Sequence, residues 1–333
     1  MPTRTKQAKK QAKKQAKKQA KTPSRTAAKQ HGAKAGGARQ QPSSGKNPQK
    51  RGPTPPFDTE DQAPPGTESQ MSPAPDHGES SYRGSGKLTG KVALVTGGDS
   101  GIGRAVALAF AREGADVVIS YLNEHDDARG AARAVEDAGR RALLIPGDIT
   151  DEAHCRALVD RTVRDFGRID LLVNNAAFQR THENIAEFST AELDRTFRTN
   201  VYAMFWLCQA AMPHLPAGGA IINVASIQAY DPSPTLLAYA STKGAIVTFS
   251  KALSKQAMER GVRVNVVAPG PVWTPLIPST MPSESVEKFG ADTTLGRPAQ
   301  PAELAPAFVF LASDDARYIT GEVMGVTGGD FVS

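Results

Sequence analysis

From about residue 87 onward, short apolar runs alternate with longer segments that repeat their apolar positions at helical spacing. Short runs bounded by glycine or polar residues predict strands, and the longer segments predict helices. The strands are apolar throughout, which is typical of parallel strands buried on both faces. The predicted strands are 91–96, 115–121, 141–147, 169–174, 220–225, 262–268 and 322–326. The predicted helices are 103–113, 124–138, 151–166, 190–215, 237–259 and 301–312.

Strict alternation of strand and helix predicts an α/β fold, with one doubly wound, Rossmann-type parallel sheet covered by helices on both faces, over residues 87–333. Such sheets bind ligands outside the carboxyl ends of their strands, where the strand order reverses. Polar residues and glycines gather at these predicted ends. They are the loop 97–103, Asp148, the pair 174–175, Ser226 and the pair 269–270. We therefore expect a binding site at this edge of the sheet.

The part of the chain before residue 87 has a different composition. Residues 1–51 hold 12 lysines, 4 arginines and no acid, which leaves 24 basic and 34 acidic groups in the rest. This low-complexity tail is predicted to be disordered, because it has almost nothing apolar to bury. A cationic tail would attract nucleic acid or another polyanion without sequence preference. A solubility tail with no specific partner is equally consistent. Residues 52–86, rich in proline and glycine, predict an extended arm.

Other classes of protein are disfavoured by the composition. No apolar run reaches membrane-spanning length, and no apolar segment follows the basic start of the chain as a signal peptide requires. Cys155 and Cys208 lie in separate predicted helices and indicate packing residues in a reducing compartment. The scattered histidines indicate no metal site. We expect a soluble cytoplasmic protein.

One stretch carries candidate proton-transfer chemistry. Tyr239 and Lys243 are four residues apart in a predicted helix, so their side chains share a face. An ammonium beside a phenol stabilises the phenolate and lowers a pKa that starts near ~10. Ser226 ends a predicted buried strand, where its hydroxyl could hold a carbonyl oxygen. The three residues predict a general acid/base site.

A glycine loop follows the first predicted strand and opens a helix. Its spacing, G-x-x-x-G-x-G at Gly97, Gly101 and Gly103, is wider than the usual dinucleotide form. Glycine allows the backbone to approach a pyrophosphate, and the helix N-terminus supplies N–H donors and a positive dipole. The strand–loop–helix context therefore predicts a dinucleotide site.

These motifs together resemble the short-chain dehydrogenase/reductase family over about residues 87–331. They are T-G-G-D-S-G-I-G at 96–103, N-N-A-A at 174–177, Asn200, Ser226, Y-x-x-x-K at 239–243 and P-G-x-V-x-T at 269–274. The arm motif P-G-x-E-x-x-M-x-P at 65–73 is similar to that of one branch, the general-stress-protein and glucose/ribitol-dehydrogenase-like oxidoreductases. The resemblance also implies a homotetramer.

The resemblance implies roles for the matched residues. Tyr239 would exchange a proton with the substrate oxygen, and Lys243 would lower the Tyr239 pKa and bind the nicotinamide ribose. Ser226 would orient the carbonyl, and Asn200 would hold a water that connects Lys243 to solvent. Thr96 would brace strands. The implied cofactor-binding residues are Gly97, Asp99, Ser100, Gly101, Ile102, Gly103, Tyr121, Asp148, Ile149, Asn175, Ala176, Tyr239, Lys243, Pro269, Gly270, Val272 and Thr274.

The end of the second predicted strand bears on the choice of cofactor. Members of the family that use NAD place an acid there to bind the ribose 2′-hydroxyl. The aligned residue here is Tyr121, and no acid precedes Glu124. Without a carboxylate, nothing repels a 2′-phosphate. We therefore expect NADP(H), with NAD(H) as the alternative.

The substrate is expected to contact Ser226, Gln228 and Tyr239. Phe178, Gln179, Tyr230 and Trp273 are expected to line the rest of its pocket, under a mobile lid at 275–292. This lining, without a charged cluster, suits a small aldehyde, ketone, sugar or polyol. The sequence thus predicts an NAD(P)-dependent alcohol dehydrogenase or carbonyl reductase that acts on CH–OH groups. The alternative is a nucleotide-sensing interaction protein tethered to a polyanion by its tail, which would have no use for the Tyr/Lys pair.

Overall fold

The computed structural model describes residues 47–58 and 60–330, so most of the predicted basic tail lies outside the described residues. Seven strands form one parallel sheet in the order β3-β2-β1-β4-β5-β6-β7. The strands are β1 (Val92–Thr96), β2 (Asp116–Tyr121), β3 (Ala142–Pro146), β4 (Leu171–Asn174), β5 (Ala220–Val224), β6 (Arg263–Pro269) and β7 (Val323–Val326). The doubly wound parallel sheet predicted from the sequence is confirmed.

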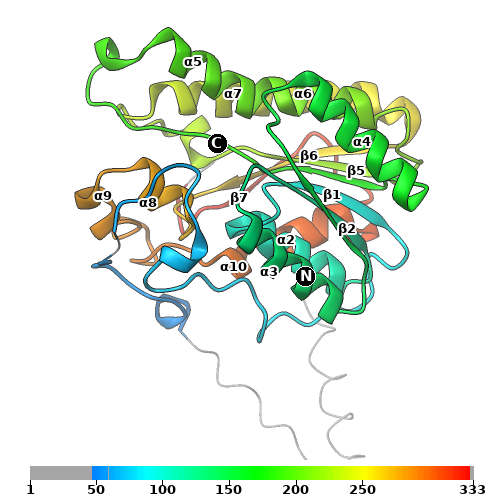
Figure 1. The fold of residues 1–333 in the computed structure, drawn as a ribbon, viewed down its shortest axis with the longest axis horizontal. Coiled ribbons are helices and arrows are strands. Elements are labelled where there is room, and N and C mark those ends of the chain that lie inside the picture. The colour runs from blue at the N-terminus through cyan, green and yellow to red at the C-terminus, as the bar shows by residue number, and fades with distance from the viewer. Residues whose placement is uncertain (1–46, 59, 331–333) are drawn as a thin grey trace, which may run out of the picture. The chain divides into compact units, whose positions relative to one another are not determined.

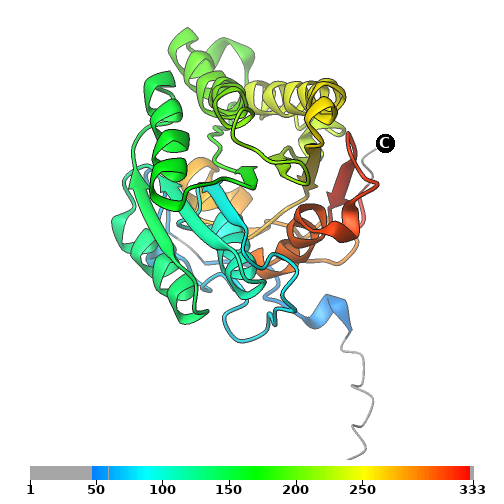
Figure 2. The same cartoon turned by 90° about the vertical axis from the view of Figure 1, so that its right-hand side faces the viewer.

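Helices cover both faces of the sheet (Figure 1). On one side lie α2, α3 and α10, and on the other lie α4, α5, α6 and α7. The turned view shows α7, in yellow, across the sheet from α10, in orange-red (Figure 2). The helices are α2 (Gly101–Arg112), α3 (His125–Asp137), α4 (Glu152–Phe166), α5 (Thr190–Phe197), α6 (Ala203–Ala211), α7 (Leu237–Ala257), α8 (Leu276–Thr280), α9 (Ser283–Glu287) and α10 (Pro301–Ala312).

Each face of the sheet has its own apolar core. Leu94 and Val118 point from their strands into the core beneath α4, α6 and α7. Their neighbours Val95 and Val117 point into the core beneath α2, α3 and α10. Strands that alternate between two cores need apolar residues at every position, which explains the continuous apolar runs.

Successive strands are added on one side of β1 up to β3 and on its other side from β4 onward, so the strand order reverses between β1 and β4. β1 pairs with β2 on one side and with β4 on the other, with Val95 opposite both Ile119 and Val173. The loops after β1 and β4 therefore leave in opposite directions and open a crevice at their carboxyl ends.

The long helix predicted over 190–215 is interrupted in the structure. α5 and α6 are joined by a π-helical turn, Arg198–Tyr202, and α6 ends at Ala211. Turns of this kind inside helices are frequent at functional sites. The interruption places Asn200 in the turn.

The described arm is extended, as its composition predicts, and two of its segments contact residues that follow β6. Residues 47–51, which the composition assigns to the tail, include a short 3-10 turn at Pro48–Lys50. The Pro48 carbonyl accepts hydrogen bonds from the buried Arg297 guanidinium, the shorter being 2.8 Å. Further along, Phe57 stacks on Trp273 with ring centroids 4.2 Å apart. The ordered arm thus begins before residue 52.

Candidate active site

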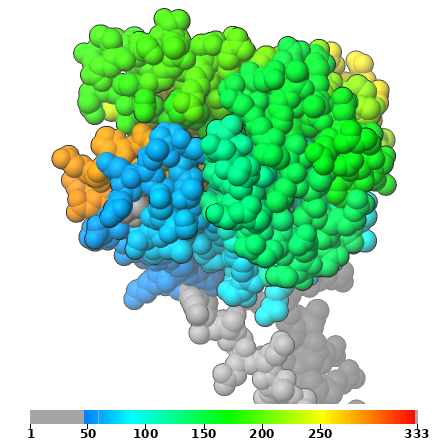
Figure 3. Space-filling model, in the orientation of Figure 1, coloured from blue at the N-terminus to red at the C-terminus, as the bar shows by residue number. Residues whose placement is uncertain are grey.

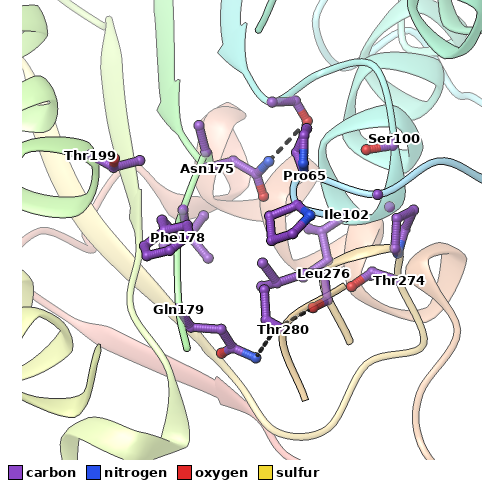
Figure 4. Close-up of a pocket in the computed structure, with 18 of the residues that line it drawn as sticks. Pro65, Ser100, Ile102, Asn175, Phe178, Gln179, Thr199, Thr274, Leu276 and Thr280 are labelled. Carbon is purple, nitrogen blue, oxygen red and sulfur yellow. Dashed lines mark hydrogen bonds between the residues drawn. The ribbon is translucent and has the colours of Figure 1, made fainter. Parts of the chain in front are cut away.

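A cavity of about 560 Å³ lies at the carboxyl ends of the strands, at the reversal between β1 and β4. This volume is within the usual range for sites that bind small molecules and cofactors. Figure 4 shows Ser100, Ile102, Asn175, Phe178, Thr274 and Leu276 around part of it. The predicted site residues that line it are Gly97, Asp99, Ser100, Gly101, Ile102, Tyr121, Asp148, Ile149, Asn175, Ala176, Ser226, Gln228, Tyr239, Lys243, Pro269, Gly270, Val272 and Thr274.

Tyr239 and Lys243 both face this cavity from the first turns of α7. The Lys243 ammonium lies 5.1 Å from the centre of the Tyr239 ring and donates a 2.8 Å hydrogen bond to the Val224 carbonyl. Lys243 is only 2% exposed, and burial lowers its pKa to about 7. The side chain can therefore exchange a proton near neutral pH.

The Tyr239 pKa differs from the expectation. Burial raises it to about 12, and a hydrogen bond with Ser226 only partly opposes this effect. Loss of solvent disfavours the phenolate here more than the neighbouring groups favour it. In this arrangement Tyr239 holds its proton firmly, so it is a proton donor until the surroundings of its oxygen change.

Ser226 lies just beyond β5 and is buried beside Tyr239. Its hydroxyl oxygen accepts a 3.2 Å hydrogen bond from the backbone nitrogen of Gln228, which fixes the turn Ile227–Ala229. The hydroxyl is thus held at the wall of the cavity, where it can donate to a substrate oxygen.

Asn200 is outside the main cavity. Its side-chain oxygen accepts from the Phe178 nitrogen at 2.8 Å, and its nitrogen donates to the Phe178 carbonyl at 2.9 Å and to the Thr242 hydroxyl at 3.0 Å. These bonds fasten the loop after β4 to α7. Asn200 also borders a separate cavity of about 10 Å³, close to the volume that one water requires. Its predicted role in a water relay stays a prediction.

The loops after β1 and β4 are bonded to each other. The Thr96 hydroxyl accepts from the backbone nitrogens of Asn175 at 3.0 Å and Ala176 at 3.1 Å. The Asn175 amide in turn donates to the carbonyls of Thr96 at 3.0 Å and Gly97 at 3.1 Å. Thr96 therefore braces the strands, as expected, and shapes the glycine loop.

Gly101 and Gly103 are required in the loop for different structural reasons. Gly101 has a φ of +48°, a left-handed conformation that side chains disfavour, and opens α2. Gly103 was predicted to bind cofactor, but it does not line the cavity. A Cβ atom on Gly103 would lie 1.8 Å from the Gly97 carbonyl oxygen, so its role is close packing of the helix against the loop.

Two carboxyl groups line the cavity next to the end of β2. Asp99 comes from the glycine loop, which bonds to the end of β2 through Gly98, and Glu124 follows β2. Asp99 is 4% exposed and Glu124 is 8% exposed. Burial, assisted by the charge of Glu124, raises the pKa of Asp99 to about 7. Two acids therefore lie near the end of β2 although the aligned residue is Tyr121, because the glycine loop is bonded to that strand.

Tyr121 and Asp148 complete this end of the cavity. The Tyr121 hydroxyl is 3.0 Å from Nδ1 of His125, which turns it toward α3. The Asp148 carboxylate accepts a 2.8 Å hydrogen bond from the backbone nitrogen of Thr150 and stays exposed at the end of β3.

The arm forms part of the cavity wall, a contact that no sequence pattern indicates. Pro64, Pro65 and Gly66 line it, and Figure 4 shows Pro65 facing the cavity. Two residues later, Glu68 accepts a 2.8 Å hydrogen bond from the Gly101 nitrogen and pairs with Arg104 at 2.5 Å. The arm thus reaches the glycine loop.

The segment predicted as a lid closes the cavity from another side and is tied to the arm. Leu276, Ile277 and Thr280 of α8 line the cavity. The Gln179 amide donates to the Thr280 hydroxyl at 3.0 Å, as Figure 4 shows. The arm, in blue, lies against α8 and α9, in orange, on the surface (Figure 3). The mobility of this segment stays a prediction.

Two residues predicted for the substrate pocket lie elsewhere. Trp273 is fully buried, stacked on Phe57, and donates a 2.7 Å hydrogen bond to the Pro73 carbonyl. Tyr230 packs against the core beneath α7 and does not line the cavity. Trp273 therefore anchors the arm rather than contacting a ligand.

Arg195 is a lining residue that the sequence did not indicate. It projects from α5, and its guanidinium lies 4.2 Å from the centre of the Phe178 ring. Its charge and that of Lys243 are on the β4–β5 side, whereas Asp99, Glu124 and Asp148 are on the β2–β3 side. The cavity is therefore acidic at one end and basic at the other.

The described residues fit a dinucleotide. The cavity is continuous from Asp148 after β3, past the glycine loop, to Lys243 on α7 and Thr274 after β6. No cluster of three or more metal-ligating side chains is found in the part of the chain that the structure describes. Within that part, no helix has the length and apolar character needed to span a bilayer.

Comparison with known proteins gives consistent matches. A family model described as enoyl-(acyl carrier protein) reductase matches residues 97–330. The chain is 54% identical to the uncharacterized oxidoreductase YhdF of Bacillus subtilis, over 81% of this chain and 93% of that protein. It is 44% identical to NADPH-dependent aldehyde reductase 1, chloroplastic, of Arabidopsis thaliana, over 81% of this chain and 96% of that protein. A short chain dehydrogenase from Burkholderia cenocepacia, solved in complex with NADP, is similar with a TM-score of 0.69 and 32% identity, over 73% of this chain and 98% of that one.

Proposed function

The chain belongs to the short-chain dehydrogenase/reductase family, and we propose that it interconverts a small carbonyl compound and its alcohol with a nicotinamide cofactor. It is an NAD(P)-dependent oxidoreductase. The observation that carries the proposal is that Ser226, Tyr239 and Lys243 face one cavity with the glycine loop. That arrangement provides a proton donor, a lysine that can exchange a proton near neutral pH and a place for a dinucleotide.

The three side chains have different roles in the transfer of the proton. The Tyr239 hydroxyl donates a proton to the carbonyl oxygen as it becomes an alcohol, and the Ser226 hydroxyl stabilises the charge that develops on that oxygen. Lys243, with a pKa lowered to about 7, is placed to return a proton near neutral pH. The cofactor, when bound, supplies or accepts the hydride. Asn200 lies outside the cavity and supports its wall by linking the loop after β4 to α7.

NADP(H) is the favoured cofactor and NAD(H) the alternative. The Arabidopsis relative is named for NADPH, and the Burkholderia structure holds NADP. Residues of this chain that would hold the dinucleotide run from Asp148 and Ile149, at the adenosine end, through Ser100 and Ile102 to Thr274 at the nicotinamide end.

The lining near Tyr239 indicates the substrate class. Phe178, Gln179 and Gln228 present apolar and amide surfaces, which suit a small aldehyde, ketone, sugar or polyol. Arg195 adds a positive charge at the same side of the cavity, and none of the described carboxylates pairs with it. Substrates that carry a carboxylate or phosphate away from the carbonyl therefore belong to the proposed class.

A purified-protein assay tests the proposal. Turnover of NADPH and of NADH is measured against matched aldehydes, ketones and sugars, with nucleotide binding measured in parallel. Turnover of at least one carbonyl class, with loss in Tyr239→Phe, supports the reaction. Nucleotide binding without turnover of any class contradicts it.

The basic segment 1–51 is proposed as an accessory, separate from catalysis. Its 16 positive charges without an acid favour contact with nucleic acid or another polyanion. Salt-sensitive DNA binding by the full chain, lost on deletion of residues 1–46, tests this contact. Equal binding by the truncated chain contradicts it.

We further propose a homotetramer in the cytoplasm. Tyr202, which ends the π-helical turn, and Phe205 of α6 are 42% and 49% exposed, and Phe205 packs on Phe249 of α7. Exposed aromatic residues of this kind are frequent in interfaces. Free, buried Cys155 and Cys208 suit a reducing compartment. Light scattering of the wild type and of Phe205→Glu tests the assembly, and cell fractionation tests the location.

A further inference from the structure

The end of the cavity next to β2 combines buried carboxyl groups with the place where the adenosine ribose binds in doubly wound folds. An acid at the end of the second strand ordinarily accepts a hydrogen bond from the ribose 2′-hydroxyl. Here the aligned residue is Tyr121, and its hydroxyl is bonded to His125. Asp99, from the glycine loop, and Glu124, which follows β2, line the same cavity and are close enough for the charge of one to act on the other.

These carboxyl groups have few partners within the protein. Oε2 of Glu124 accepts from the Asn123 nitrogen at 3.0 Å, whereas Oε1 is buried and has no hydrogen-bond partner among the described residues. Asp99 is held by Ser100 and by its own backbone nitrogen. A buried acceptor without a donor is costly, so a donor from a ligand would stabilise it.

The charges that surround the pair do not neutralise it. Asp127, at the start of α3, adds a third negative charge nearby. On the α2 side, Arg104 is paired with the arm residues Glu68 and Glu79. On the α3 side, Arg129 is paired with Asp126. The arm's His77 is bonded to Glu68. No cation in the described part of the chain forms an ion pair with Asp99 or Glu124.

We propose that Asp99, together with Glu124, sets the choice between NAD(H) and NADP(H), and that this choice depends on pH. The 2′-hydroxyl of NAD(H) can donate a hydrogen bond to either carboxylate. The 2′-phosphate of NADP(H) must instead approach two acids, which repel it when both are ionised. When Asp99 carries a proton, it can donate to the phosphate, so the repulsion falls. This inference rests on the proposed function and refines its cofactor preference.

The direction of the pH effect follows from the surroundings of Asp99. Burial and the charge of Glu124 raise its pKa to about 7, so it is mostly neutral at pH 6 and mostly ionised at pH 8. The ratio of the dissociation constants of NADP⁺ and NAD⁺ should therefore rise with pH. We expect a rise of about tenfold between pH 6 and pH 8, as one added charge in a partly buried site produces.

The experiment measures binding of NADP⁺ and NAD⁺ to the full chain by isothermal titration calorimetry at pH 6, 7 and 8. It compares the wild type with Asp99→Asn, which keeps the shape and removes the charge. Asp137→Asn is the matched control, since Asp137 is exposed at the last residue of α3 and forms no ion pair with the described residues. The 2′-phosphate itself titrates near pH ~6, and the control carries that contribution unchanged.

The expected result is a ratio that rises in the wild type and in Asp137→Asn, and that rises much less in Asp99→Asn, which binds NADP⁺ more tightly at pH 8. Circular dichroism confirms folding, and Glu124→Gln replaces Asp99→Asn if the latter does not fold. A ratio that is independent of pH, or the same slope in Asp99→Asn as in the wild type, overturns the inference while the proposed function stands. Failure to bind either nucleotide at any pH overturns both.

Discussion

The carboxylate of Glu68 accepts a 2.8 Å hydrogen bond from the backbone nitrogen of Gly101, the first residue of α2. Glu68 belongs to the arm, and its charge lies where the helix dipole is positive. The same carboxylate contacts Arg104 at 2.5 Å and His77 at 2.6 Å. The arm is therefore bonded directly to the loop that would hold the cofactor.

Replacing Glu68 should destabilise the folded chain. In Glu68→Gln the carboxylate is lost, and Arg104 and the Gly101 nitrogen keep a weaker partner in a buried site. Breaking one side of a buried ion pair costs about 3 kcal/mol, and the free energy of unfolding should fall by about that amount. Denaturant unfolding measures it. Glu60→Gln, an exposed position on the same arm, is the control, and equal effects of the two variants would contradict the prediction.

Tyr239→Phe should separate catalysis from binding. The change removes only the hydroxyl that donates the proton, so turnover should fall by roughly 10²–10⁴-fold, as loss of a general acid does. The nucleotide dissociation constant should stay within about twofold, because the ring remains beside Lys243. Steady-state kinetics and calorimetry measure the two quantities. Tyr318→Phe, at a fully exposed tyrosine, is the matched control. Full activity of Tyr239→Phe would exclude the proposed proton donor.

Lys243 should make the stability of the protein depend on pH. Burial lowers its pKa from 10.5 to about 7 in the folded state, so the unfolded chain binds the extra proton between these values. The cost of burying the charge is therefore present in full below pH 7 and is relieved as the pH rises toward 10.5.

Comparison with Lys243→Met isolates this contribution, because all other groups titrate alike in both proteins. Relative to the variant, the wild type should gain roughly 4 kcal/mol of stability between pH 7 and pH 10. Denaturant unfolding at both pH values gives the difference. A difference that stays constant with pH would show that the buried lysine does not lose its proton.

Much of the fold could be predicted because β-strands buried on both faces leave continuous apolar runs. β1 and α10 begin and end within a residue of their predicted bounds. The candidate proton-transfer pair could also be predicted, since Tyr239 and Lys243 are only four residues apart in the sequence. The arm contacts could not, because Glu68 and Pro65 lie in a segment without periodicity, and only tertiary packing brings them to Gly101 and α8.

The same limit applies to charge. Asp99 and Glu124 are far apart in the sequence, and no local pattern shows that the glycine loop turns one toward the other. Their burial, which decides the Asp99 pKa, is a property of the folded cavity. Likewise, the sequence shows Arg195 only as a charged residue on an amphipathic helix. Its position over the Phe178 ring follows from the fold.

Arg195 should select among substrates by charge. The guanidinium is exposed at the cavity wall over Phe178, so it can bind a carboxylate at the far end of an aldehyde. In Arg195→Met, kcat/KM for 4-oxobutanoate should fall by about tenfold, the size expected for one exposed charge-assisted contact, while that for the neutral butanal stays unchanged. Arg198→Met, three residues on and paired with Asp194, is the control. Equal losses for both aldehydes would mean that Arg195 only supports Phe178, and unchanged values for both would remove acid-bearing carbonyls from the proposed class.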